Sequence, residues 1–144
     1  MNKWGRTSKT QYDTAHPDLQ LIADTVLQIH DASFMQGHRD KETQNKYFNN
    51  GTSKVQWPNG KHNTLPSKAM DLAPYIKGEN PYDMERVLFF AGIVMAVADM
   101  LYKQGKITHK LKWGGSWRSE ADAVFSFDRN GFFDGIHFEL VVRL

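Results

Sequence analysis

The sequence predicts an α+β domain in which helices flank a small antiparallel sheet. Segments with helical periodicity and segments with strand-like alternation both occur, but they do not follow the strand–helix–strand rhythm that builds a parallel sheet. The 144 residues contain no repeat, low-complexity tract or linker, and this length is typical of one domain. We therefore expect residues 1–144 to form a single domain that buries one hydrophobic core.

The first element that the sequence predicts is a helix beginning at His16. Residues 1–14 before it are polar, and we expect them to be irregular or extended. Pro17 suits the first helical turn, and Asp18 is favourable near the positive end of the helix dipole. Apolar residues then recur at helical spacing; they are Leu19, Ile22, Ala23, Val26 and Leu27.

The middle of the chain is predicted to alternate between short elements and loop. Residues 33–37 favour a strand, and residues 40–49 favour a polar helix that Gly51 closes. Residues 52–66 are rich in Gly, Asn, Pro and Ser, which is typical of a loop. Residues 68–74 favour a second short strand.

The second half of the chain contains the strongest helical pattern, residues 83–104, which Gly105 ends. Residues 111–113 favour a short strand, and the connection over residues 118–135 has room for a surface hairpin. The broad apolar face of the long helix consists of Val87, Leu88, Ala91, Val94, Met95, Ala98 and Leu101.

Composition narrows the class of protein. Cysteine is absent, which excludes disulfides and leaves His, Asp and Glu as ligands for any metal site. A net charge of +2 and a pI of about 8.8 are too weak a basic excess to indicate a nucleic-acid partner. The N-terminus lacks the apolar segment of a secretory signal, and the longest apolar stretch, residues 87–101, is too short to span a bilayer. We expect no membrane insertion, and a protein that stays in the cytoplasm of its host until something else releases it.

Three residues form a candidate metal site: His62, Asp71 and His137. Asp71 stands in a short apolar strand, where an unpartnered carboxylate is costly if it is buried. A metal or a buried hydrogen-bond network would compensate, and an aspartate that faces solvent at a strand edge is an equally good interpretation. Two histidines and one carboxylate with an open fourth position match a catalytic zinc site better than a structural one.

Asp134 is the candidate catalytic base. Residues 136–142 alternate as a strand that places His137 and Glu139 on one face. Asp134 precedes His137 by three positions, across Gly135, and such a turn can aim both side chains into one cleft. Zinc hydrolysis uses a carboxylate that lies near the metal but is not bound to it. The spacing alone is weakly specific for this role.

Four blocks of residues occur in a specific order and separation. They are Gly37-His38-Arg39 with Gln44, Tyr47, Gly51 and Ser53; His62-Asn63 with Ser67, Ala69 and Asp71-Leu72-Ala73-Pro74-Tyr75; Trp113-Gly114-Gly115-Ser116-Trp117; and Asp134, His137, Glu139 and Leu140. In these blocks the chain resembles the LAS-type zinc peptidases, which include VanX-like and VanY-like D-Ala-D-Ala peptidases. The resemblance is closest to their phage branch, the L-alanyl-D-glutamate endopeptidase endolysins. It covers most of the chain and implies the LAS/hedgehog-type peptidase fold.

The resemblance also implies a role for each site residue. His62, Asp71 and His137 match the three ligands of one zinc ion per chain. Asp134 matches the acidic general base. Arg39 matches the arginine that stabilises the oxyanion, a task that suits a guanidinium because it stays charged and donates in a fork. Without the resemblance, Arg39 would be interpreted as a surface arginine that follows a strand.

Six further residues in the matching blocks are candidates for binding the substrate. Aromatic side chains among them can line a peptide cleft, but packing is an equally good interpretation for any one of them. The six candidates are Gln44, Ser53, Ser67, Tyr75, Trp113 and Trp117.

The resemblance implies hydrolysis of a peptide bond in the stem of bacterial peptidoglycan, and the endolysin branch favours the bond between L-Ala and D-Glu. A D,D-carboxypeptidase or dipeptidase that acts on D-Ala termini is the alternative within the same class. A non-catalytic wall-binding module on the same fold is the alternative outside it, and the intact site residues argue against that alternative. We expect a monomeric catalytic domain with no separate wall-binding module, which lyses the wall once the membrane has been permeabilised.

Overall fold

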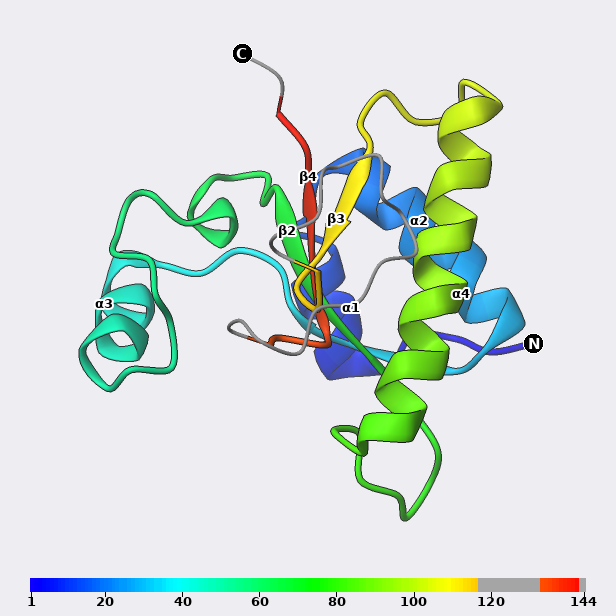
Figure 1. Ribbon diagram of the computed structural model, residues 1–144, viewed down its shortest axis with the longest axis horizontal. Helices are drawn as coiled ribbons and strands as arrows, with labels where there is room; N and C mark the ends of the chain where they lie inside the picture. The colour runs from blue at the N-terminus through cyan, green and yellow to red at the C-terminus, as the bar shows by residue number, and fades with distance from the viewer. Residues whose placement is uncertain (117–132, 143–144) are drawn as a thin grey trace.

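A four-stranded antiparallel sheet forms the centre of the molecule. The computed structural model describes residues 1–116 and 133–142 (Figure 1). In these residues the strands follow the order β1-β2-β4-β3, and each neighbouring pair is antiparallel. Their bounds are β1 (Ala32–Gln36), β2 (Ala69–Pro74), β3 (Leu111–Trp113) and β4 (His137–Leu140). The predicted α+β class is confirmed, and most of the connection that was expected to hold a hairpin lies outside the described residues.

Two long helices cover one face of the sheet (Figure 1). They are α2 (Pro17–Ile29) and α4 (Met84–Lys103). The first begins one residue after its predicted start, and the second lies within one residue of its predicted bounds at each end. Asp83 caps α4 by accepting a hydrogen bond from the Arg86 backbone at 3.2 Å. Gly105 follows the helix with a φ of +72°, a left-handed conformation that glycine adopts at low cost. No helix in the described ranges is long and apolar enough to cross a membrane.

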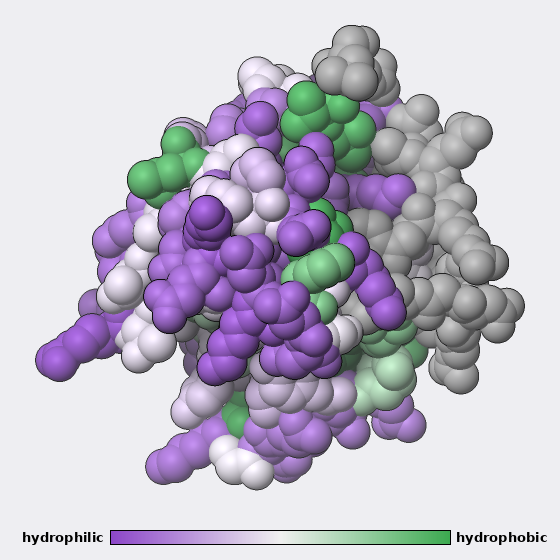
Figure 2. All heavy atoms as spheres, turned by 90° about the vertical axis from the view of Figure 1, so that its left-hand side faces the viewer, coloured by the Kyte–Doolittle hydropathy of each residue, from purple (hydrophilic) through white to green (hydrophobic). Residues whose placement is uncertain are grey.

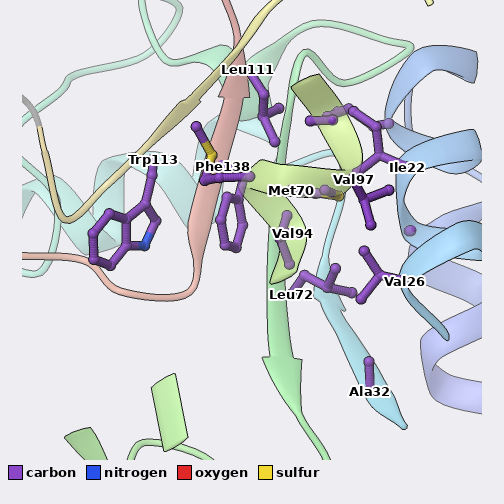
Figure 3. Packing of buried hydrophobic residues seen from close by; sticks show 14 of the residues in the cluster. Ile22, Val26, Ala32, Met70, Leu72, Val94, Val97, Leu111, Trp113 and Phe138 are labelled. Carbon is purple, nitrogen blue, oxygen red and sulfur yellow. The ribbon is translucent and has the colours of Figure 1, made fainter. Parts of the chain in front are cut away.

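The hydrophobic core lies between these helices and the sheet. Figure 3 shows Ile22 and Val26 of α2 and Val94 of α4 meeting the inward side chains Met70 and Phe138. All five are fully buried, and burial of one such side chain stabilises a fold by about 1.5–3 kcal/mol. Because strand residues alternate between faces, the residues between these inward positions lie on the opposite face of the sheet.

The N-terminal segment forms a helix, α1 (Arg6–Tyr12), so the prediction of an irregular or extended start is wrong. The helix buries none of its residues and therefore has no apolar stripe to reveal it. Its polar side chains instead accept hydrogen bonds from the outer edge of β1 and the residues after it. Ser8 Oγ accepts from Phe34 N at 3.0 Å, and Gln11 Oε1 accepts from Gly37 N at 3.1 Å. These bonds satisfy edge donors that would otherwise be unpaired.

A polar arm projects from the sheet on the left of Figure 1. It contains α3 (Lys41–Asn49) and the 3₁₀ turn η1 (Lys61–Asn63), and Asp40 caps α3 by accepting from Thr43 N at 2.8 Å. The only α3 residue that is buried is Gln44. Figure 2 looks onto this side of the molecule and shows a mostly hydrophilic surface with separate hydrophobic groups. The arm therefore does not extend the core; it forms one wall of a cleft.

Candidate metal centre and cleft

The sheet register brings together two of the three predicted metal ligands. Asp71 on β2 lies opposite His137 on β4. The neighbouring pair Met70 and Phe138 points into the core, so Asp71 and His137 lie on the face of the sheet that the long helices do not cover. His62 approaches the same point from η1. We call His62, Asp71 and His137 the central cluster.

The ligand atoms of the central cluster stand at the corners of a nearly equilateral triangle. His62 Nε2 lies 3.2 Å from His137 Nδ1, and Asp71 Oδ1 lies 3.3 Å from each of these nitrogens. A tetrahedral zinc ion with bonds of about 2.0 Å has ligand atoms about 3.3 Å apart. The triangle therefore fits one face of such a tetrahedron.

The second ring nitrogen of each histidine also has a contact. His62 Nδ1 donates to the carbonyl oxygen of Gly37 at 2.7 Å. His137 Nε2 lies 3.0 Å from Glu139 Oε1. Because a carbonyl oxygen can only accept, this contact keeps a hydrogen on Nδ1 and turns Nε2 toward the other two ligands.

Asp71 has the environment of a carboxylate that pairs with a cation. Its Oδ1 atom is buried and accepts no hydrogen bond within the described residues, which is costly unless positive charge compensates. Burial alone would raise the pKa of Asp71, but His62 and His137 outweigh burial and hold that pKa well below its usual range. The carboxylate is therefore ionised at neutral pH.

The surroundings of His137 favour the doubly protonated, positively charged form of its ring when no metal is bound. Burial lowers the pKa of this ring, but the close contacts and charges of Asp71 and Glu139 outweigh burial and raise the pKa to about 10. A metal ion that binds here must displace one of these protons, so metal binding is coupled to proton release. The central cluster could hold a metal ion, and its donors fit one.

Fixed contacts hold Arg39 beside the central cluster. Its Nε donates to Gln36 Oε1 at 3.2 Å, and its Nη1 donates to Gln44 Oε1 at 3.1 Å. The guanidinium also lies 4.7 Å from the centre of the Tyr47 ring, and its Nη2 lies 3.7 Å from Asp71 Oδ2. The charged group is therefore ordered before any ligand arrives.

A tight backbone turn places Asp134 next to the same site. Asp134 N donates to Gly114 O at 2.9 Å, and His137 N donates to Asp134 O at 3.1 Å. A Cβ atom on Gly114 would lie 2.2 Å from Asp134 O, so this approach requires glycine. Burial raises the pKa of Asp134, as does the nearby charge of Asp71, and these effects outweigh the opposing charges. Asp134 is therefore a better proton acceptor than an ordinary aspartate.

An open cleft of about 1020 Å³ surrounds these groups. One wall comes from α3 and the loop after it, and the other comes from the sheet and the start of α4. The lining includes Met35, Gln36, Arg39, Gln44, Tyr47, Ser53, Val55, Lys61, His62, Asp71, Tyr82, Met84, Val87, Phe133, Asp134, His137 and Glu139. All five predicted catalytic and metal-binding residues thus meet in one cleft.

The residues predicted to bind substrate, as far as the structure describes them, lie in three different settings. Gln44 and Ser53 line the cleft, but Gln44 is almost fully buried and donates to Ser53 Oγ at 3.0 Å. Tyr75 is 48% exposed and lies outside the cleft. Trp117 lies outside the described residues.

Ser67 and Trp113 lie beneath the cleft, which differs from the substrate contact that the sequence predicted. Ser67 is fully buried, and its Oγ lies 2.6 Å from Ala69 O and 3.1 Å from the Gly37 carbonyl that His62 also uses. Trp113 is 6% exposed, and its ring N–H donates to Gly135 O at 2.8 Å. Both side chains therefore support the backbone that carries the site.

Sequence reasoning assigned no role to Gln36 or Glu139. The register between β1 and β2 shifts near Gln36 and places it opposite Asp71; no alternation pattern reveals such an irregularity. The sequence did contain a signal for Glu139: it stands two residues after His137, so both side chains lie on the same face of the strand.

A second group of two histidines and one aspartate lies away from the cleft. It consists of His16, Asp18 and His109, and we call it the outer cluster. His16 Nδ1 accepts from Asp18 N at 3.0 Å and so caps α2. His109 is bound to the same aspartate, because its Nδ1 donates to Asp18 Oδ2 at 2.8 Å.

The fold and the centre together define a class of protein, a small α+β domain with a candidate mononuclear metal site in an open cleft. The crystal structure of the L-Ala D-Glu endopeptidase ChiX of Serratia marcescens has a similar fold, with a TM-score of 0.69 and 20% sequence identity. The alignment covers 94% of this chain and 87% of that one.

Sequence comparison then identifies the family. Residues 1–141 match the family described as phage L-alanyl-D-glutamate peptidase, and the chain belongs to this family. It is 32% identical over 143 residues to the L-alanyl-D-glutamate peptidase of Escherichia phage T5, an alignment that covers 96% of this chain and 98% of that protein. The resemblance drawn from the four sequence blocks is confirmed.

Proposed function

We propose that this chain is a zinc-dependent peptidase of bacterial peptidoglycan that hydrolyses the bond between L-Ala and D-Glu in the stem peptide. The observation that carries the proposal is the central cluster, whose three ligand atoms lie 3.2–3.3 Å apart in a cleft shared with Asp134 and Arg39. Membership of the phage L-alanyl-D-glutamate peptidase family supports the choice of bond.

One zinc ion would be held by His62 Nε2, Asp71 Oδ1 and His137 Nδ1. Two imidazole nitrogens and one carboxylate oxygen suit zinc, whereas magnesium and calcium prefer oxygen ligands alone. Bound zinc supplies a Lewis acid that makes water a strong nucleophile near neutral pH and polarises the scissile carbonyl. Three protein ligands leave the fourth position for that chemistry.

Asp134 acts as the general base. Its carboxylate takes one proton from the attacking water and gives one proton to the amino group of the departing D-Glu residue as the peptide bond breaks. The new carboxyl group forms on L-Ala, so atoms and charge balance. The raised pKa of Asp134, caused by burial and by Asp71, suits a group that must both accept and donate.

Arg39 stabilises the negative charge that develops on the scissile carbonyl oxygen. Its contacts with Gln36, Gln44 and Tyr47 fix the guanidinium before the reaction, so little reorganisation is needed in the transition state. Its fourth neighbour, Asp71, lies 3.7 Å away, which leaves donor capacity on the guanidinium for the substrate.

The cleft suits a peptide segment more than a single small ligand, because about 1020 Å³ is at the upper end of ordinary ligand sites. Ser53 remains a candidate substrate contact there. One chain supplies every residue of the proposed site, so we propose that a monomer is active. We further propose that the enzyme reaches the wall from the host cytoplasm when the membrane is permeabilised.

Digestion of purified peptidoglycan, followed by mass spectrometry of the fragments, tests this function. The zinc-loaded protein should release stem peptides with a new amino terminus at D-Glu, and a metal chelator should stop the release. Loss of terminal D-Ala alone would indicate a D,D-carboxypeptidase instead. Binding to the wall without any cleavage would indicate a non-catalytic module.

A further inference from the structure

The carboxylate of Glu139 contacts the ring nitrogen of His137 that points away from the other two residues of the central cluster. Glu139 follows His137 by two residues on β4, so both side chains leave the same face of the strand. Glu139 Oε1 lies 3.0 Å from His137 Nε2, and the Glu139 side chain is only 16% exposed. The other ring nitrogen of His137, Nδ1, faces Asp71 and His62.

This contact determines how the His137 ring is presented. A carboxylate that accepts from Nε2–H keeps the hydrogen on that nitrogen and leaves the lone pair of Nδ1 pointing at the metal position. It also opposes rotation of the ring about its bond to Cβ and makes Nδ1 more basic. The ring therefore meets the metal already oriented and with greater donor strength.

The two histidines of the centre differ in what holds them. The ring of His62 is fixed by the backbone carbonyl of Gly37, which no side-chain substitution removes. The ring of His137 is fixed by the side chain of Glu139. Only the second contact can be tested by replacing a side chain.

We propose that Glu139 is a positioning residue, which orients His137 and strengthens it as a metal ligand. The proposal rests on the zinc centre proposed above. Because Glu139 also lines the cleft, the competing role is direct contact with the substrate, and the two roles predict different measurements. A positioning residue changes zinc affinity in the absence of substrate, whereas a substrate contact changes KM alone.

The test is the zinc dissociation constant of the metal-free protein, measured by competition with a chelating indicator. Loss of a comparable carboxylate–histidine contact weakens metal binding by about 10–100-fold, and we expect this loss for Glu139→Leu. Glu139→Gln retains an oxygen that accepts from Nε2 but lacks the charge, so its affinity should lie between those of wild type and Glu139→Leu. Glu85 is exposed in the first turn of α4, and the matched controls Glu85→Leu and Glu85→Gln should leave zinc affinity unchanged.

Thermal melts of the metal-free variants separate positioning from general stability. If Glu139→Leu fails to fold, Glu139→Gln carries the test. Wild-type zinc affinity in a folded Glu139 variant that loses only stability, or that changes only KM, would overturn the positioning role and leave the proposed function standing. Failure of the wild-type protein to bind zinc would instead overturn the proposed function.

Discussion

The central and outer clusters have the same composition, two histidines and one aspartate, but different hydrogen bonding. In the outer cluster, Asp18 Oδ2 accepts from Thr108 N at 3.0 Å, from Thr108 Oγ1 at 3.2 Å, and from His109 N and Nδ1 at 3.1 and 2.8 Å. In the central cluster, Asp71 Oδ1 is buried without a hydrogen bond in the described residues. Both clusters bring the same ligand types together, so proximity does not distinguish them; the acceptor that the described residues leave unsatisfied does, and it lies in the central cluster.

The histidines of the two clusters show the same contrast. In the outer cluster, His16 Nδ1 is used to cap α2 and His109 Nδ1 is used to bind Asp18. The outer cluster therefore joins the start of α2 to the segment that leads into β3, and we expect it to contribute to stability. In the central cluster, the three ligand atoms lie 3.2–3.3 Å from one another, and we expect this cluster to contribute to catalysis.

The largest expected effect comes from removing one histidine from each cluster. His137→Ala should abolish both stoichiometric zinc and peptidase activity, because the triangle loses one corner. His109→Ala should retain one zinc per chain and its activity. Atomic emission on dialysed samples measures the zinc. Full zinc retention by His137→Ala, or loss of zinc from His109→Ala, would break the distinction between the clusters.

Asp134→Ala should lower kcat by about 10²–10⁴-fold while one zinc stays bound. Since burial and Asp71 raise the pKa of Asp134, the acidic limb of kcat/KM in the wild type should lie above the usual aspartate range of about 4. The activity is lost below that limb because the base becomes protonated. Steady-state kinetics from acidic to neutral pH measures both effects, and loss of zinc together with activity would make Asp134 a ligand instead.

Arg39→Lys should lower kcat by about 10²–10³-fold, the effect of removing one oxyanion donor, because lysine keeps the charge and loses the planar fork. His38 is the matched control, since it neighbours Arg39 in sequence but does not line the cleft. His38→Ala should have a much smaller effect on kcat. Steady-state kinetics on a soluble stem peptide measures both effects, and thermal melts show whether each variant is folded. If His38→Ala lost kcat and Arg39→Lys did not, the oxyanion role would belong to His38.

The smallest expected effect concerns the outer cluster. Asp18→Asn weakens several hydrogen bonds to a charged acceptor and should cost about 1–3 kcal/mol of unfolding free energy, with zinc content unchanged. Burial would raise the pKa of Asp18, but the bonds from His109 and Thr108 outweigh burial and lower it.

The sign of the pH dependence follows from that lowered pKa. The ionised carboxylate stabilises the fold above the pKa of the unfolded chain, about 3.9, and this contribution disappears as pH falls through the lower folded value. Urea unfolding at neutral and acidic pH should therefore show the difference between wild type and Asp18→Asn shrinking in acid. A difference that grows in acid would contradict this account of the outer cluster.

Regular hydrophobic periodicity is what made most of the fold predictable. The apolar positions of α2 and α4 recur at helical spacing and are buried or packed against the core, so both helices could be predicted closely. The helix α1 could not, because Ser8 and Gln11 fix it through polar contacts with β1. Such contacts depend on tertiary structure and leave no period in the sequence.

The residues that meet in the cleft could be predicted, but the roles of several neighbours could not. The order of the sequence blocks placed Arg39, Asp71 and His137 in one predicted site. The sheet register explains why Asp71 and His137 lie side by side. A polar residue can face the cleft, or it can be buried and bind the backbone that carries the site. Which of the two applies depends on tertiary packing, which the neighbouring sequence does not reveal. Ser67 and Gln44 are buried and bonded to the protein itself, although their motif position suggested substrate binding.

Anomalous diffraction at the zinc edge, from a crystal of the zinc-loaded protein, tests the central claim most directly. We expect one strong peak per chain, about 2.0–2.1 Å from His62 Nε2 and His137 Nδ1 and about 2.0–2.2 Å from Asp71 Oδ1, with no peak at the outer cluster. A peak at the outer cluster, or none at the central cluster, would contradict the claim that unsatisfied acceptors mark the metal site.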